Sequence, residues 1–139
     1  MAEGYEVEGV WKARGRGLRM AVIEPPGVVV HLTGQVAWDA EERIVGRGDP
    51  ERQTRQCLAN VEALLARLGG RLGDVVSLTT HFTDRAHLPA IQRARAEAFG
   101  PEGGPASTSV MVAGLGHEDF LVELTPVAVV PPERFRPLG

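Results

Sequence analysis

Apolar positions follow two different periods along the chain. Alternation with polar residues, or β-branched runs, is typical of strands and covers five segments: residues 18–23, 28–37, 74–83, 107–113 and 120–130. An apolar residue at every third or fourth position is typical of helices and covers two segments, residues 50–68 and 88–99. The pattern therefore predicts the element order β-β-α-β-α-β-β.

Residues that start and stop helices flank both helical segments. Asp49 is a suitable N-cap and Pro50 suits the first helical position, while Gly69-Gly70 is expected to end the first helix. The second helix is expected to start near Leu88-Pro89 and to end at Gly100-Pro101. These signals support the boundaries that the periodicity indicates.

Turn residues separate the strands at both ends of the chain. Pro25-Pro26-Gly27 divides the first two strands, and a glycine-rich turn over residues 114–119 divides the last two. The simplest interpretation is that each pair of strands forms a hairpin. On that interpretation Ser107 and Ser109 lie beside Glu123 across the second hairpin.

The element order predicts an α+β fold with one sheet and both helices on one face. The opposite face would carry alternate residues of the last two strands. These residues are Ser107, Ser109, Met111, Ala113, Leu121, Glu123, Thr125, Val127 and Val129. Because this face is too apolar to be left to water, we predict that another subunit covers it.

Composition narrows the class of protein. The 139 residues, 43% of them hydrophobic, suit a single domain with a core over about 18–130 and an extended tail over 131–139. Fifteen basic and 18 acidic residues give a net charge of −3, which disfavours nucleic acid as a partner. A lone Cys57 and the absence of a long apolar run predict a cytoplasmic protein with no disulfide and no membrane span.

A series of short motifs resembles the Rid family, also called YjgF or L-PSP endoribonuclease proteins. The motifs are Thr33-Gly34-Gln35, residues 56–61, 72–76, 79–84, 96–99 and 105–110, and Val122-Glu123-Leu124. Their order and spacing carry the resemblance across nearly the whole chain. It implies a chorismate-mutase-like fold that assembles as a homotrimer, with small-molecule pockets in the clefts between subunits.

The chain departs from the family at the positions that bind substrate. In the imine deaminases of the family, the third position of a Pro-Ala-Arg-Ser motif holds the pocket arginine, and here it is Ser107. Ser109 replaces a pocket cysteine, and Met20 aligns with a tyrosine. Since serine lacks the charge and the two parallel donors of arginine, efficient hydrolysis of 2-aminoacrylate-type imines is not expected.

The resemblance assigns roles to the remaining candidates. Glu123 is retained and would position water or act as general base. Ser107 and Ser109 would hydrogen-bond a ligand, Gly34 would line the pocket with backbone, and Gln92 would be an amide at its rim. The ordinary alternatives are a solvated glutamate, a sheet glycine and an exposed glutamine.

Other residues could complete such a pocket. His117 lies in the turn between the last two strands and could overhang the cleft. Arg19 or Arg95 could supply the positive charge that position 107 lacks. The four histidines show no zinc-binding spacing and no cysteine joins them, so neither a metal nor another cofactor is expected.

Three functions remain open from the sequence. The first is a divergent Rid-type hydrolase or deaminase that acts on a C–N bond of a small molecule. The second is a ligand-binding or regulatory trimer without catalysis. The third, endoribonuclease activity, has the least support because the chain is acidic overall and its seven aromatic residues are not interleaved with basic ones.

Overall fold

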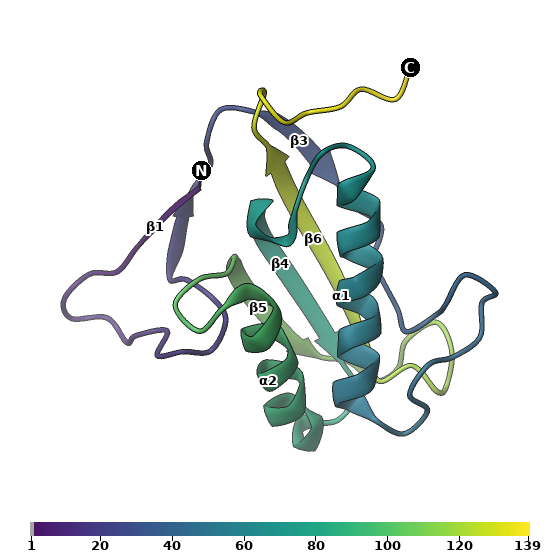
Figure 1. The fold of residues 1–139 in the computed structure, drawn as a ribbon. Coiled ribbons are helices and arrows are strands. Elements are labelled where there is room, and N and C mark those ends of the chain that lie inside the picture. The colour runs from purple at the N-terminus through teal and green to yellow at the C-terminus, as the bar shows by residue number, and fades with distance from the viewer. Residues whose placement is uncertain (1) are drawn as a thin grey trace.

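The computed structural model describes residues 2–139, which fold into an α+β structure (Figure 1). The strands are β1 (Glu3–Tyr5), β2 (Ala21–Ile23), β3 (Val28–His31), β4 (Val75–Phe82), β5 (Ala106–Met111) and β6 (Val122–Val130). The helices are α1 (Pro50–Ala66) and α2 (Leu88–Phe99), with single 3-10 turns η1 (Leu72–Asp74) and η2 (Arg85–His87).

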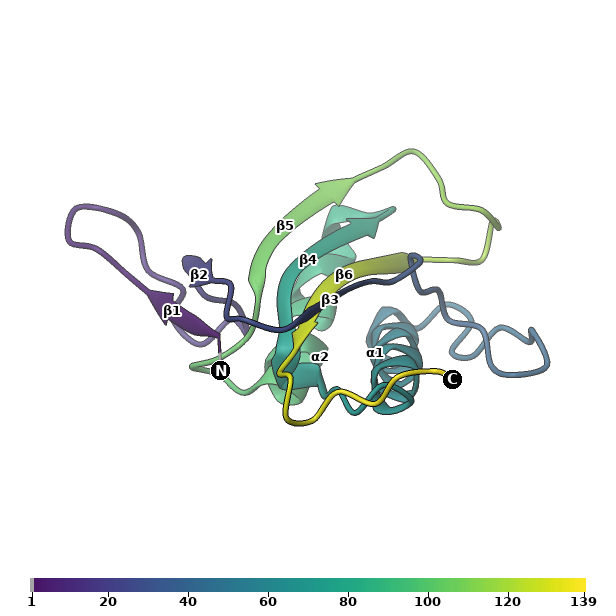
Figure 2. The ribbon, with the colours of Figure 1, turned by 90° about the horizontal axis from the view of Figure 1, so that it is seen from above.

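The main sheet has the strand order β3-β6-β4-β5. Strand β6 is antiparallel to both β3 and β4, whereas β4 and β5 are parallel and α2 connects them. Both helices lie on the same side of this sheet, as Figure 2 shows. The predicted fold class is therefore confirmed.

Both predicted hairpins are wrong. Strand β2 pairs with β1 in a separate two-stranded sheet, and β3 pairs with β6 at the edge of the main sheet. Strand β4 lies between β5 and β6, so the connection after β5 passes the end of β4 before the chain returns. Turn residues show that the chain changes direction, but they do not show which strand receives the next one.

The strand expected over residues 28–37 is shorter than predicted. Regular pairing ends at His31. After it, the N–H of Leu32 donates to the carbonyl of Pro126 at 3.4 Å, and an isolated bridge joins Gln35 to Leu124. The N–H of Gln35 donates to the carbonyl of Leu124 at 2.7 Å, and the N–H of Leu124 donates back at 3.0 Å. This bridge places residues 33–35 beside the first half of β6.

The predicted caps place α1 against the sheet. The Asp49 side chain accepts a hydrogen bond from the N–H of Arg52 at 3.0 Å, which satisfies one free donor of the first turn. The buried side of α1 includes Cys57, Leu58, Val61 and Leu65. These side chains and their partners on β4, β6 and α2 form the apolar core between helices and sheet.

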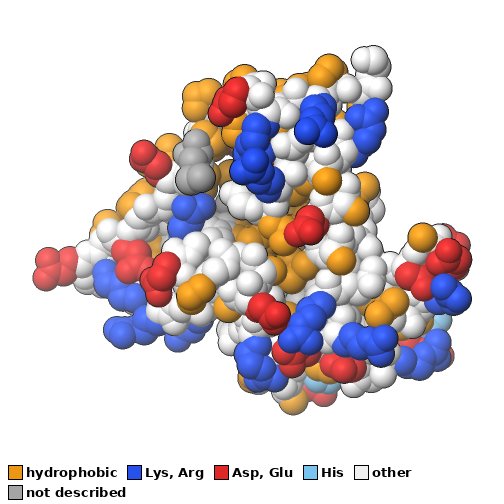
Figure 3. Space-filling view, in the orientation of Figure 1, with side chains coloured by type: hydrophobic (Ala, Val, Ile, Leu, Met, Phe, Trp, Pro, Cys, Tyr) orange, Lys and Arg blue, Asp and Glu red, His pale blue; other side chains and the backbone are white. Residues whose placement is uncertain are grey.

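Charged residues border the gap between the two helices. Figure 3, which looks onto the helices, shows apolar side chains in the hollow between α1 and α2 and charged side chains around it. Leu58, Ala94 and Ala98 line this hollow, and Arg55 bridges its edge to Glu97 at 3.1 Å. None of the candidate site residues lies in it.

The segment before β2, residues 2–17, forms an arm that the sequence pattern did not predict as structured (Figures 1 and 2). Arg19 holds the start of this arm beside the loop before β5, because its guanidinium donates to the carbonyls of Ala2 at 3.1 Å and Gly104 at 2.6 Å. Ala2 packs with Val76 and Val129 on the sheet face opposite the helices. The arm therefore covers one end of the face that we expected only another subunit to cover.

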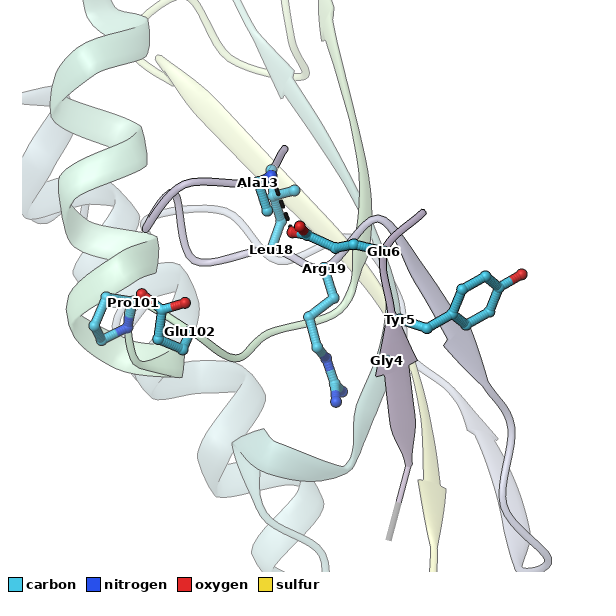
Figure 4. Close-up of a pocket in the computed structure, with 8 residues that line it drawn as sticks. All are labelled: Gly4, Tyr5, Glu6, Ala13, Leu18, Arg19, Pro101 and Glu102. Atoms are coloured by element: carbon cyan, nitrogen blue, oxygen red, sulfur yellow. Dashed lines mark hydrogen bonds between the residues drawn. The ribbon is translucent and has the colours of Figure 1, made fainter. Parts of the chain in front are cut away.

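Arg19 also borders a cavity of about 280 Å³ beneath the arm (Figure 4). Gly4, Tyr5 and Glu6 line it on one side, and Pro101-Glu102 lines it on the other. The Glu6 carboxylate accepts a hydrogen bond from the N–H of Ala13 at 3.3 Å, which closes the arm on itself.

The tail after β6 turns back onto the end of α1. Arg134 donates to the carbonyl of Gly69 at 2.8 Å and makes two hydrogen bonds with the Asp74 carboxylate. The N–H of Arg136 donates to the carbonyl of Leu68 at 2.9 Å. Among residues 2–139, no helix combines the length and the hydrophobicity that crossing a membrane requires.

Candidate functional site

Glu123 lies on β6 with its side chain on the sheet face opposite the helices. Its neighbours Val122 and Leu124 are fully buried in the core on the helix side, so the alternation of the strand directs Glu123 outward. His81 of β4 is its partner in the antiparallel register. The prediction that Glu123 faces away from the helices is confirmed.

The Glu123 carboxylate is half-buried and borders Gly34. A Cβ atom at position 34 would overlap Oε2 of Glu123 and would lie 2.9 Å from its Cδ. Glu123 makes no hydrogen bond or ion pair within residues 2–139. An unpaired carboxylate in a partly desolvated position can accept a proton from water, provided that a substrate lies within hydrogen-bonding reach.

Ser107 and Ser109 do not share the face of Glu123, contrary to the prediction. In the parallel register, Ser107 is the partner of Leu78 and Ser109 is the partner of Thr80. Leu78 and Thr80 are buried toward the helices, so the serine side chains lie on the helix side. The sequence could not fix this orientation, because β5 is an edge strand and polar residues occupy both of its faces.

A buried arginine from α2 meets these serines. Arg95 is only 2% exposed, and its Nη1 donates to Thr80 Oγ1 at 2.9 Å, to Ser109 Oγ at 3.2 Å and to Ser107 Oγ at 3.5 Å. Among residues 2–139, its Nε has no hydrogen-bond partner. Burial lowers the pKa of Arg95 below the ordinary value for arginine, because desolvation disfavours the charged form.

A second cavity, of about 290 Å³, adjoins β5 on the side of the arm. It brings together three candidates from the sequence, Arg19, Met20 and Ser107, with Trp11 of the arm and Ser77 of β4. Trp11 is 63% exposed and was not predicted as a site residue. The only signal for it was a single tryptophan in a segment rich in glycine and arginine.

The remaining two candidates lie elsewhere. Gln92 is half-buried on α2. His117 makes local contacts in the connection before β6: its Nδ1 accepts a hydrogen bond from the N–H of Asp119 at 3.0 Å, and its ring lies 5.5 Å from that of Phe120. Neither residue joins Glu123 or the serines within one chain.

Cys57 is the single thiol of the chain, and it is buried in the core. Burial raises the pKa of the Cys57 thiol to about 12, and the nearby Glu123 charge adds to the increase. It is therefore unsuited to act as a nucleophile at neutral pH. Within the part of the chain that the structure describes, no three His, Cys, Asp or Glu side chains gather as metal ligands.

Comparison with known proteins identifies the family of this fold and site. The model of the family described as Endoribonuclease L-PSP matches residues 19–130. The chain therefore belongs to this family, the Rid or YjgF family, as the sequence motifs predicted.

Two relatives illustrate the match in sequence. The 3-aminoacrylate deaminase RutC of Acinetobacter baylyi is 37% identical over 102 residues, which is 73% of this chain and 79% of that protein. A RutC family protein of Pyrococcus horikoshii is 33% identical over the same shares of the two chains.

Solved structures agree with this assignment. The Rid family protein YyfB of Yersinia pestis has a TM-score of 0.84 and 30% identity, over 93% of this chain and 98% of that one. A YjgF family member from Mycobacterium tuberculosis has a TM-score of 0.63 and 28% identity, over 81% and 86%. The first match extends the likeness beyond the residues that the family model covers.

Proposed function

We propose that the protein is a divergent Rid-type hydrolase that cleaves the C=N bond of a small metabolite, as a deaminase does. The observation that carries this proposal is the half-buried, unpaired carboxylate of Glu123 beside Gly34. Membership of the family and similarity to a protein named 3-aminoacrylate deaminase support the same reaction class.

In the proposed reaction, Glu123 accepts a proton from water as the water oxygen forms a bond to the imine carbon. Glu123 passes that proton to the imine nitrogen, which gives a neutral carbinolamine with the hydroxyl and the amine on the same carbon. Glu123 then takes the hydroxyl proton and delivers it to the amine, so that the C–N bond breaks as the C=O bond forms, and ammonia and a carbonyl compound leave. Glu123 ends the cycle as a carboxylate, ready for the next turnover.

We further propose that the site is shared between subunits of a homotrimer. Glu123 and the serines at positions 107 and 109 lie on opposite faces of one sheet, so a small ligand that touches both needs a second copy of the chain. Val110 and Met111 of β5 are exposed at an edge of the sheet, where a neighbouring subunit would bury them. Sedimentation at micromolar concentration tests this: a monomer would contradict the shared site.

Turnover of a panel of imines, enamines and acylated amines tests the function, with product carbonyl and ammonia measured separately. Glu123→Gln keeps the shape of the side chain but cannot accept a proton, and it should abolish turnover. Glu62→Gln, on an exposed position of α1, is the matched control and should leave turnover unchanged. Equal activity of Glu123→Gln and the wild type would remove Glu123 from the mechanism.

The alternative function is a non-catalytic trimer that binds a ligand. The serine in place of arginine at position 107 favours it, because weaker substrate binding is compatible with a pocket that binds a ligand without turnover. It predicts saturable binding of a panel compound by calorimetry without any product. Endoribonuclease activity would be supported instead by RNA cleavage that survives purification and that pocket substitutions abolish.

A further inference from the structure

Arg95 is a buried cation without an anionic partner. Its exposed fraction is 2%, and no carboxylate of residues 2–139 forms an ion pair with it. By contrast Arg93, two positions earlier on the same helix, is exposed and reaches Glu51 at 3.5 Å. Helix α2 thus carries one ordinary surface arginine and one that the fold encloses.

Such a charge is unfavourable unless something compensates it. Removing a guanidinium from water is costly, and the usual compensation in proteins is a carboxylate or phosphate that accepts two hydrogen bonds. Within the described part of the chain, the hydrogen-bond partners of Arg95 are the neutral hydroxyls of Thr80, Ser107 and Ser109, all on Nη1, and its Nε has none. The cluster is therefore short of negative charge.

The two serine hydroxyls connect this charge to the surface. Each serine oxygen accepts from Arg95, so the hydroxyl hydrogen of each serine remains free to donate to a ligand. Thr80 is fully buried, whereas Ser107 is half-buried and Ser109 is exposed on the edge strand β5. The cluster is thus closed on the core side and open at β5.

We propose that Arg95 supplies the positive charge for an anion-binding subsite at the β5 edge, in which Ser107 and Ser109 donate directly to a carboxylate group of the ligand. This inference rests on the proposed function only for the assignment of that ligand as the substrate. The sequence left open whether Arg19 or Arg95 replaces the charge that position 107 lacks, and the hydrogen bonds from Arg95 to both serines favour Arg95. The charge comes from the helix behind the strand, and it acts mainly through two polarised hydroxyls.

This arrangement predicts a particular specificity. A carboxylate would accept hydrogen bonds from both serines and would also be attracted electrostatically by the positive charge of Arg95 behind them. An amide of the same shape would make only neutral hydrogen bonds. The subsite should therefore prefer carboxylates to their amides. Because the guanidinium is recessed, the preference should be smaller than for an arginine that grips the ligand directly.

Calorimetric titration with pyruvate and pyruvamide, which have the same shape and differ in charge, tests the subsite. The wild type should bind pyruvate at least 10-fold more tightly than pyruvamide at pH 7 and low salt. In Arg95→Gln the two affinities should come within about 2-fold of each other. Arg93→Gln removes the same charge from the same helix and should keep the wild-type preference.

A second set of variants separates binding from folding. Arg95→Met removes the unpaired charge, so it should melt at or above the wild-type temperature and lose the stabilisation that pyruvate gives the wild type. Ser107→Ala with Ser109→Ala keeps the arginine and should lose most of the preference for pyruvate. A wild type that binds the two probes equally, or an Arg95→Gln variant that keeps the preference, would overturn the proposal.

The test of the anion subsite and the test of the proposed hydrolase function can fail independently of each other. Glu123→Gln should lose turnover but keep the preference for pyruvate, because the carboxylate group is held elsewhere. If Glu123→Gln abolishes turnover and Arg95→Gln leaves the probe affinities unchanged, the anion subsite is refuted and the hydrolase remains. If no substrate turns over but the charge preference is present, the subsite stands without the reaction.

Discussion

Gly34 leaves open the space that the Glu123 carboxylate occupies. The bridge between Gln35 and Leu124 holds the glycine against β6, and any side chain at position 34 would collide with Oε2 of Glu123. The glycine is therefore needed for room rather than for an unusual backbone conformation. A residue that looks like a sheet glycine in the sequence determines where the carboxylate can lie.

Gly34→Ala should displace Glu123 and lower kcat/KM by about 100-fold, the usual cost of misplacing a reacting group by about 1 Å. The fold should persist, because the carboxylate can rotate toward solvent. Gly73→Ala is the control, since a Cβ there meets nothing within 4 Å and the residue has no left-handed φ. Steady-state kinetics and melting temperature measure the two effects, and unchanged kinetics in Gly34→Ala would argue against this placement.

Gly17 should matter for stability because the arm crosses α2 there. Its φ is +72°, and a Cβ would lie 2.6 Å from the Cα of Ala96. Gly48, with φ +74° and nothing within 4 Å, isolates the cost of the left-handed backbone alone, about 1–2 kcal/mol. Urea unfolding should show Gly17→Ala less stable than Gly48→Ala by roughly a further 1–3 kcal/mol. Equal losses would mean that the arm does not pack closely on α2.

Cys57 should resist thiol reagents in the folded protein at pH 8 and react fully after unfolding. The pKa of its thiol is raised to about 12, against 9.0 for an unperturbed cysteine, so the folded state keeps its proton where the unfolded state has lost it. The free energy of unfolding is therefore independent of this thiol below about pH 9. It falls as the pH rises from about 9 toward 12, because in that interval only the unfolded state has lost the thiol proton. Cys57→Ala should show a smaller loss of stability over that interval, and rapid native labelling would contradict the burial.

The pair of Arg134 and Asp74 should stabilise the return of the tail. Asp74 accepts two hydrogen bonds from the guanidinium, and the same contact raises the pKa of Arg134. Arg134→Ala should cost about 1–2 kcal/mol of unfolding free energy, as expected for charge-assisted hydrogen bonds of limited exposure.

The control for Arg134 is Arg43→Ala, which breaks a surface pair with Asp39. The Arg43 side chain is 73% exposed, against 26% for Arg134, so its loss should stay within about 0.5 kcal/mol. Chemical unfolding measures both variants. A loss for Arg43→Ala as large as that for Arg134→Ala would mean that burial does not set the difference.

Both helices and the strands of the main sheet follow from local chemistry, and so they could be predicted, whereas β1 of the arm could not. Asp49 and Pro50 start α1 where expected, and the alternation of β6 places Glu123 outward because its neighbours Val122 and Leu124 need the core. Strand β5 offered no such signal, since Ser107, Thr108 and Ser109 are polar on both faces. The face of a sheet toward which a strand residue points can be predicted only where one set of alternate residues along the strand is apolar enough to require burial.

By itself the sequence determined the element order from β2 to β6, the fold class, the family and the choice of Glu123 as the leading candidate, because periodicity, caps and motifs are local. Only the tertiary structure decided that β4 separates β5 from β6, that Gly34 borders Glu123, and that Arg95 lies behind the serines. Strand pairing and helix docking depend on the burial of many distant side chains at once. No single segment carries that information, so the charge that position 107 lacks could be located only once α2 was placed against the sheet.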